Sequence, residues 1–365
     1  MNRLSADETA AVLTLNEFET LAKGRMTHTA YEYVAAGVAD DVTLAENCLA
    51  FQRIRLLPRV LADVSRIDTG VTLFGVQHEF PILLAPTGYH KLAHPDGEME
   101  TVRGADLSGA TLMAACFSTV SFTEMSSAAE RPLWFQAYLQ PDRAFTKDLI
   151  QRAIAAGCGA LCLSVDVPVN GPRDREMRAK FALPEGVERA NLSSLGSAVA
   201  GATHRHFGRN IYNAVRASNA TWKDLDWMRS LIRVPFLVKG ILHADDAEMA
   251  IGAGCDGIIV SNHGGRSVDT VPASIDALPP IINRVAGRVP VLVDGGIRRG
   301  TDVYKALARG ASAVLIGRPY LYGLAVAGAA GVARVVEILR TELEMTMGLM
   351  GTATLSEIGR DSLLD

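Results

Sequence analysis

Polar and charged residues stand at the ends of several short apolar segments, and their types suit acid–base chemistry and anion binding. His263 follows the segment 257–262 and precedes two glycines and Arg266. A histidine can act as a base, glycines permit close approach of a ligand, and an arginine can bind a carboxylate through two hydrogen bonds. The other candidates at such ends are Thr87, Gly88, Gln136, Tyr138, Ser164, Asp166, Lys239, Ser261, Asp294, Gly295, Gly296, Arg298, Gly317 and Arg318.

Lys239 ends the otherwise apolar segment 235–240. A lysine in such a place must pair with an anion or change its pKa, and beside a flavin it would stabilise negative charge on the reduced ring. A Schiff-base lysine is the rival chemistry, and a lysine whose ammonium group reaches solvent is the plain alternative.

Two glycine-rich turns, DGGIRRG at 294–300 and IGRP at 316–319, follow the last two apolar segments. Backbone amides, a helix N-terminus and arginines at such turns can bind phosphate. Glycines that only permit a tight turn explain either motif alone. Because the two occur together, the sequence favours a phosphate site.

Eight apolar segments recur from residue 81 onward, with longer amphipathic stretches between them. They are 81–86, 111–115, 133–138, 160–166, 235–240, 257–262, 290–296 and 313–318. Continuous apolar character is typical of parallel strands covered on both faces. Eight strand–helix units in series predict an α/β fold, the (β/α)8 TIM barrel, in which the strand ends share one face. An open doubly wound sheet is the alternative, but no GxGxxG turn follows the first segment.

Two regions exceed a minimal barrel. Residues 1–80 contain predicted helices near 15–22, 29–37 and 44–51. Residues 167–234 are more than one barrel helix needs, and their position after the fourth strand favours a mobile lid over an inert insertion. We predict one domain over 1–365, with an N-terminal helical segment to residue 80, a barrel over 81–330 and a C-terminal helix over 331–365.

Composition and charge argue against a nucleic-acid-binding, membrane-bound or secreted protein. With 36 basic and 40 acidic residues the net charge is −4, and no basic cluster predicts binding to nucleic acid or a membrane. The five scattered cysteines and the charged N-terminus indicate neither disulfides nor a signal peptide, so we expect a cytoplasmic protein. The pairs His90/His94 and His204/His206 have metal-like spacing, but no further ligands accompany them, and no metal is expected.

Long motifs in a consistent order carry a resemblance to a known family. They are YEYVAAGVADDVTLAEN (31–47), APTGYHKLAHPDGE (85–98), WFQAY (134–138), SVDVPVNGPRDREMR (164–178), LVKGI (237–241), SNHGGRSVDTVPASIDALP (261–279) and VDGGIRRGTDVYKALARGASAVLIGRP (293–319). Together they resemble the FMN-dependent L-2-hydroxy acid oxidase and dehydrogenase family, which includes glycolate oxidase, lactate oxidase, lactate monooxygenase and mandelate dehydrogenase. The resemblance implies FMN as cofactor, oxidation of an L-2-hydroxy acid to the 2-keto acid, and a homotetramer.

The resemblance also implies roles for individual residues. His263 resembles the base that takes a proton from the substrate hydroxyl or α-carbon as hydride or electrons pass to flavin N5, and Asp166 resembles the carboxylate that steadies it. Arg173 and Arg266 match the arginines that clamp the substrate carboxylate. Tyr33 and Tyr138 match tyrosines that hydrogen-bond the substrate. The predicted cofactor-binding set is Thr87, Gly88, Gln136, Ser164, Lys239 and Ser261 near the ring, and Asp294, Gly295, Gly296, Arg298, Gly317 and Arg318 near the ribityl chain and phosphate.

Four positions depart from common family patterns. Gly88 stands where many oxidases have alanine, which would widen the space near the flavin, so oxygen and a quinone or dye both remain as acceptors, with weak peroxide release expected. Ala115 lacks a hydroxyl that often contacts flavin. Phe117 and Asn170 are predicted to line the substrate pocket, where other members have tryptophan and an apolar residue. The alternatives are an FMN-dependent monooxygenase of the lactate monooxygenase type, an FMN barrel isomerase, and a flavin-binding protein without turnover.

Overall fold

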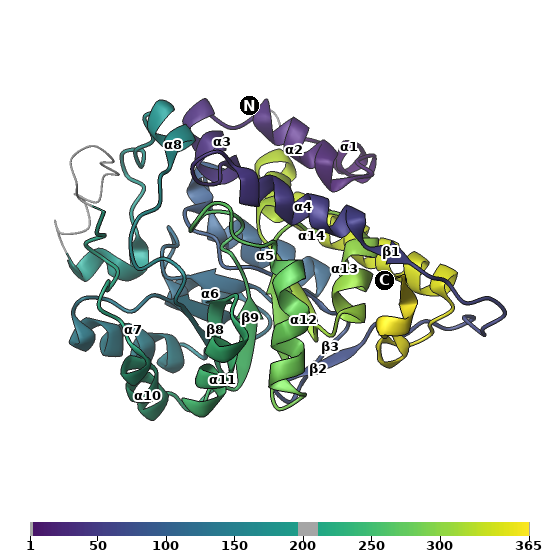
Figure 1. Cartoon of the computed structure of the whole chain (residues 1–365). Helices are drawn as coiled ribbons and strands as arrows, with labels where there is room; N and C mark the ends of the chain where they lie inside the picture. The colour runs from purple at the N-terminus through teal and green to yellow at the C-terminus, as the bar shows by residue number, and fades with distance from the viewer. Residues whose placement is uncertain (1–2, 196–210, 365) are drawn as a thin grey trace.

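A parallel barrel forms the centre of the computed structural model, which describes residues 3–195 and 211–364 (Figure 1). Its strands are β4 (Ile82–Leu84), β5 (Met113–Ala115), β6 (Trp134–Ala137), β7 (Ala160–Ser164), β8 (Phe236–Ile241), β9 (Gly257–Val260), β10 (Val291–Asp294) and β11 (Ala313–Ile316). Hydrogen bonds connect them in the order β4-β11-β10-β9-β8-β7-β6-β5. A parallel bridge between Leu84 and Leu112 closes the circle. All eight predicted strands and the (β/α)8 barrel are confirmed.

The barrel interior is packed with side chains rather than open. A buried cluster includes Leu83, Met113, Trp134, Cys162, Leu237, Ile259, Leu292 and Leu315, drawn from all eight strands. The hairpin of β2 (Val71–Leu73) and β3 (Val76–His78) closes the end at which the strands begin, because Leu73 and Phe74 join this cluster. The Phe74 ring centroid lies 5.6 Å from that of Trp134. The functional end of the barrel is therefore the opposite one, at the strand C-termini.

Four helices precede the barrel: α1 (Ala6–Ala10), α2 (Leu15–Lys23), α3 (His28–Ala35) and α4 (Val42–Arg53). The last three confirm the predicted helices, whereas the five-residue α1 was not predicted. Figure 1 shows α2, α3 and α4 crossing the upper side of the molecule, with β2 and β3 at the lower side. Asp269 fixes the start of α4, because its carboxylate accepts the backbone N–H groups of Asp40, Val42 and Thr43. The N-terminal segment is thus tied to the loop after β9.

The outer layer consists of the helices that follow the strands. They are α5 (Glu98–Ser108), α6 (Phe122–Ala128), α7 (Arg143–Ala155), α10 (Trp222–Leu231), α11 (Ala244–Gly252), α12 (Ser274–Val285), α13 (Gly300–Ala308) and α14 (Arg318–Met350). The predicted C-terminal helix begins earlier than expected, at Arg318 rather than near residue 331. It combines two helices across a kink at Ala327 and Gly328, whose backbone angles are not helical. By length and composition α14 could cross a membrane, but 61% of its apolar window is buried, as in a core helix.

Residues 167–234 contain more regular structure than predicted. They include α8 (Asp174–Arg178), the 3-10 helix η2 (Ala190–Leu195) and α10. Three residues of this segment, Arg173, Phe181 and Arg216, line a cavity at the strand C-termini. Residues 196–210 lie outside the described residues, so the mobile lid stays a prediction. Short β1 (Arg55–Leu56) pairs with β12 (Leu363–Leu364) and joins the segment after α4 to the last described residues.

Candidate active site

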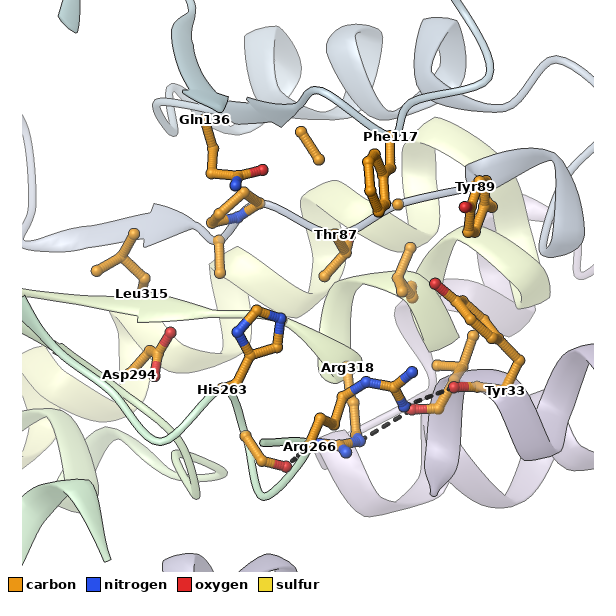
Figure 2. A pocket seen from close by; sticks show the side chains of 18 of the residues that line it. Tyr33, Thr87, Tyr89, Phe117, Gln136, His263, Arg266, Asp294, Leu315 and Arg318 are labelled. Carbon is orange, nitrogen blue, oxygen red and sulfur yellow. Dashed lines mark hydrogen bonds between the residues drawn. The ribbon is translucent and has the colours of Figure 1, made fainter. Parts of the chain in front are cut away.

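A cavity of about 750 Å³ opens at the C-terminal ends of the strands, within the size range of small-molecule and cofactor sites. Most predicted site residues line it: Tyr33, Thr87, Gly88, Phe117, Gln136, Tyr138, Arg173, Lys239, His263, Arg266, Asp294, Gly295, Gly296, Arg298, Gly317 and Arg318. Figure 2 shows His263 between two groups, with Gln136 and Asp294 on one side and the aromatic residues Phe117, Tyr89 and Tyr33 on the other. Four predicted residues, Ser164, Asp166, Asn170 and Ser261, stand behind this lining and hold residues within it.

His263 and Asp166 form a hydrogen-bonded pair. The His263 Nδ1 atom lies 2.9 Å and 3.1 Å from the two carboxylate oxygens of Asp166. The opposite ring nitrogen, Nε2, lies 3.4 Å from the Tyr138 hydroxyl. Gly240 has a φ of +108°, and a side chain there would collide with Asp166 at 2.5 Å, so glycine is required for this approach. The arrangement leaves Nε2 of His263 facing the cavity as a base.

Electrostatics keeps this histidine neutral. Burial lowers the pKa of His263, and the positive charge of Lys239 lowers it further, although Asp166 acts in the opposite direction. Burial alone would raise the pKa of Asp166, but His263 and Lys239 hold it below its usual range. The carboxylate is therefore ionised and the imidazole is unprotonated near neutral pH, as a general base requires.

A row of aromatic rings lines one part of the cavity, which we call the aromatic part. The rings belong to Tyr33, Tyr89, Phe117, Tyr138 and Phe181. Successive ring centroids are 4.4 Å apart between Phe181 and Tyr33, and 5.5 Å apart between Tyr33 and Tyr89. The row continues through Phe117, 5.2 Å from Tyr138. Burial raises the pKa of Tyr138, so its hydroxyl stays protonated and can donate a hydrogen bond.

Arg173 and Arg266 come together through a carboxylate that the sequence interpretation did not identify. Glu176, only 1% exposed, accepts a 2.8 Å hydrogen bond from each arginine on the same oxygen. Arg173 also donates to the backbone carbonyl of Arg266, and the Arg266 guanidinium lies 5.0 Å from the Tyr33 ring centroid. Two arginines beside one buried carboxylate keep a net positive charge, which suits the binding of an anionic group.

Lys239 pairs with Asp294 deeper in the cavity. The ammonium group lies 3.1 Å from one Asp294 oxygen and donates to the Ser261 hydroxyl at 2.8 Å. Burial would lower the pKa of Lys239, but Asp294 and Asp166 raise it, so the lysine stays charged. This excludes the neutral amine that a Schiff base needs. Nearby, the Gln136 amide donates to the Ser164 hydroxyl at 3.0 Å.

The predicted phosphate end lies where β10 and β11 finish. Gly296 has a φ of +84°, and a side chain there would meet the Asn47 carbonyl at 1.9 Å. Arg318 was predicted to lie near the ribityl chain and phosphate. In the structure its guanidinium also donates to the carbonyl oxygens of Val34, Ala36 and Gly264, each at 2.9 Å. That side chain therefore anchors the C-terminal end of α3 to the barrel. Phosphate binding would fall to Arg298, to the remaining N–H groups of Arg318, and to the backbone amides at the start of α14.

Comparison with known proteins gives this geometry its context. Residues 22–365 match the family described as FMN-dependent dehydrogenase. The chain belongs to this family. It is 44% identical over 351 residues to an L-lactate oxidase of Nostoc sp., covering 95% of this chain and 96% of the relative. A glycolate oxidase 3 of Arabidopsis thaliana is 43% identical over 350 residues, covering 96% and 95%. A crystal structure of mandelate oxidase with (S)-2-phenylpropionate has a TM-score of 0.87 at 36% identity, covering 97% and 98%.

The residues of this member of the family fit the cofactor. Oδ1 of Asp294 is buried and has no hydrogen-bond partner among the described residues, so a donor such as a ribityl hydroxyl would satisfy it. Lys239, Gln136 and the backbone of Thr87 would hold the ring system. Arg298 and the backbone near Gly296 would hold the phosphate. FMN as cofactor, predicted from the sequence, is confirmed by the family.

Several residues of the site were not predicted. Glu176 could have been found from its spacing, because a helix after Arg173 places the residue three positions on beside it. Asn47 exchanges hydrogen bonds of 2.9 Å and 2.8 Å with Asn262 and so supports the His263 loop. Arg189 and Arg216 lie in the long segment without periodicity, where the sequence carries no signal of what they face.

Replacement of Glu176 by glutamine is expected to raise the KM of the acid substrate about 10- to 100-fold. The two arginines would lose the shared carboxylate that holds them together, and like charges would separate them. Steady-state kinetics with a dye acceptor measure the effect, and Glu185→Gln, an exposed change in the same segment, is the matched control. An unchanged KM would show that Arg173 and Arg266 hold their positions without Glu176.

Proposed function

We propose that this protein oxidises an L-2-hydroxy acid to the corresponding 2-keto acid, with FMN as the bound cofactor. The observation that carries the proposal is the Asp166–His263 pair, whose free ring nitrogen faces the same cavity as the Arg173–Arg266 clamp. Relatives named L-lactate oxidase and glycolate oxidase support the same reaction. An isomerase acting on a diphosphate is disfavoured, because a clamp of two arginines beside a base suits a carboxylate.

Binding comes first. Arg173 and Arg266 bind the α-carboxylate of the substrate, and the Tyr33 ring lies beside them, with its centroid 5.0 Å from the Arg266 guanidinium. The substrate hydroxyl then lies toward His263 and Tyr138, whose Nε2 and hydroxyl oxygen are 3.4 Å apart. This orientation places the α-carbon and its hydroxyl within reach of a single base.

Proton transfer follows. His263 takes a proton from the substrate hydroxyl or α-carbon at Nε2, and Asp166 stabilises the imidazolium that results through the bond to Nδ1. FMN, when bound, would supply the oxidant, so that the two electrons and the second hydrogen of the substrate HC–OH group would pass to its N5 edge. Lys239 supplies a fixed positive charge at the far side of the cavity, held by Asp294 and Ser261. The substrate leaves as the 2-keto acid.

Anaerobic mixing of the FMN-loaded protein with L-2-hydroxy acids tests this function. Bleaching of the flavin absorbance by an L-acid, and not by its D-enantiomer, is expected. If no L-2-hydroxy acid bleaches the flavin, the protein is a flavin-binding protein without turnover. Admission of oxygen then distinguishes the routes, because an oxidase releases peroxide and keto acid while the monooxygenase alternative yields a decarboxylated acid.

The electron acceptor is part of the proposal. We expected the absence of a side chain at Gly88 to leave open space near the flavin. Instead, a methyl group at this position would meet the Cβ atom of Phe117 at 3.2 Å and the carbonyl oxygen of Phe117 at 3.3 Å. Phe117 therefore occupies the region that a missing side chain would have opened. We retain both oxygen and a quinone or dye as acceptors, with weak peroxide release relative to dye reduction as the expected outcome of the oxygen step.

We also propose a cytoplasmic homotetramer. Free cysteines at positions 48, 116, 158, 162 and 255 support a reducing compartment. Exposed apolar side chains, including Val60 at 83% and Leu349 at 80%, support burial of part of the surface in an oligomer. Light scattering on the eluted holoenzyme measures the oligomeric state.

The substitution Asp166→Asn is expected to lower kcat about 10- to 100-fold and to shift the pH profile. Asp166 favours the protonated form of His263, so its removal lowers the pKa of His263 further. Because activity needs neutral His263, kcat/KM falls when the pH drops through that pKa, and the acid limb must move to lower pH. Profiles of kcat/KM against pH test this, with the exposed Asp226→Asn as control. An acid limb that stays in place or moves upward contradicts the assigned role.

A further inference from the structure

A polar corner of the cavity lies beside Tyr138 and consists of Asn170, Asn213 and Arg216. Arg216 lines the cavity and is 8% exposed. One of its amino groups donates to the Asn170 side-chain oxygen, which also accepts from Asn213 at 3.3 Å. Asn170 was predicted to bind substrate. The structure instead places it behind the lining, where it holds Arg216.

The backbone fixes Arg216 close to the catalytic residues. The N–H of Ala217 donates to the carbonyl of Leu139 at 2.8 Å, which joins this segment to the residue after Tyr138. The Arg216 guanidinium lies 5.5 Å from the Tyr138 ring centroid. Since Tyr138 also contacts His263, Arg216 stands within the substrate region rather than at the cofactor end.

The charge of Arg216 is uncompensated in the described parts of the chain. No described carboxylate forms an ion pair with it, and its buried Nε atom has no hydrogen-bond partner there. Asp166 acts on it from a distance but is bonded to His263. Residues 196–210 contain no Asp or Glu in their sequence. A buried charge without a counterion is costly, so an anion from outside the chain would stabilise it.

Guanidinium groups lie along the aromatic part of the cavity. Arg266 lies over Tyr33, and Arg216 lies over Tyr138. Arg173 and Arg266 share the carboxylate of Glu176, so a substrate α-carboxylate bound by these two arginines would leave Arg216 without an anion. A second carboxylate on the substrate would supply that anion.

We propose that Arg216 binds a second carboxylate, on the side chain of the substrate, so that L-2-hydroxy dicarboxylic acids are preferred over monocarboxylic acids of equal length. The proposal rests on the proposed function, because the Arg173–Arg266 clamp must hold the α-carboxylate. The two nitrogen atoms of a guanidinium match the two oxygens of a carboxylate, which gives the contact its selectivity.

Two pairs of acids of equal length test the proposal: L-malate with L-2-hydroxybutyrate, and L-2-hydroxyglutarate with L-2-hydroxyvalerate. For the native holoenzyme, kcat/KM for the dicarboxylate is expected to exceed that for its partner by at least about tenfold. In Arg216→Gln the ratio of the two values is expected to fall about 10- to 100-fold, and Arg216→Lys should retain part of it. A matched surface control is Arg233→Gln, which should keep the native ratio.

The outcomes separate cleanly. If Arg216→Gln lowers both members of a pair equally, Arg216 acts on Tyr138 or on the α-carboxylate, and the proposal is wrong. If the native enzyme prefers the monocarboxylic acids, it is also wrong, while the proposed function stands. Bleaching by no acid at all would instead contradict the proposed function. If Arg216→Gln fails to fold or to bind FMN, two measurements still test the proposal. They are the preference of the native enzyme for dicarboxylates and the ratio of kcat/KM values in Arg216→Lys.

Discussion

Replacement of His263 by glutamine should lower kcat/KM for the hydroxy acid about 100- to 10,000-fold, the range for loss of a general base. Glutamine can keep a hydrogen bond to Asp166, but it cannot accept a proton at the position of Nε2. The Arg173–Arg266 clamp is unaffected, so the loss should appear in kcat and in the rate of anaerobic flavin reduction. The KM should change little by comparison.

Stopped-flow reduction of the bound flavin measures this effect directly. His243→Gln is the control, because His243 is 70% exposed at the start of α11 and does not line the cavity. An absorbance spectrum of bound flavin in both variants shows that folding and cofactor binding are intact. Reduction of the His263→Gln flavin at the native rate would remove His263 from the role of base.

Replacement of Lys239 by methionine is expected to have the second large effect, on cofactor retention and stability together. It leaves Asp294 buried at 7% exposure without its cation. Breaking a buried ion pair by removing one partner costs about 3–5 kcal/mol. The same change removes the positive charge that Lys239 would place beside the FMN ring. We expect FMN affinity to fall at least about 100-fold and the unfolding transition of the apoprotein to move to lower denaturant concentration.

A double variant separates the two causes. Lys239→Met with Asp294→Leu removes both charges, so it should recover much of the apoprotein stability but not the affinity for FMN. Equilibrium dialysis against FMN and denaturant unfolding of the apoprotein provide the two measurements. Lys147→Met, an exposed change on α7, is the control. Normal FMN binding by Lys239→Met would show that the lysine serves only to neutralise Asp294.

Much of the fold was predictable because buried strands require apolar residues at consecutive positions, and this pattern is visible in the sequence. Strands β4 to β11 are covered on both faces, and continuous apolar segments reveal that directly. The break in α14 at Ala327 and Gly328 was less visible, since small residues are common on both sides of it. The five-residue α1 is too short for periodicity to be recognised.

The site was predictable where its residues sit at strand ends and less so elsewhere. Lys239 lies within β8, Asp294 ends β10 and His263 follows β9, so the barrel itself brings them together. Arg173 entered only through the resemblance, and Arg216 not at all, because a loop of irregular structure gives no rule for where its side chains point. The guanidinium contacts of Arg318 depend on carbonyl groups about 280 residues earlier, which no local pattern records.

These long-range contacts have a consequence for how the chain is made. Arg318 bonds to Val34 across 284 residues, and Arg266 bonds to Tyr33 across 233. At about 5–20 residues per second on the ribosome, helix α3 waits roughly 15–60 s for its last partner. Helix α3 is therefore fixed in place long after it is synthesised, and the catalytic cavity is completed only once Arg318 has been made.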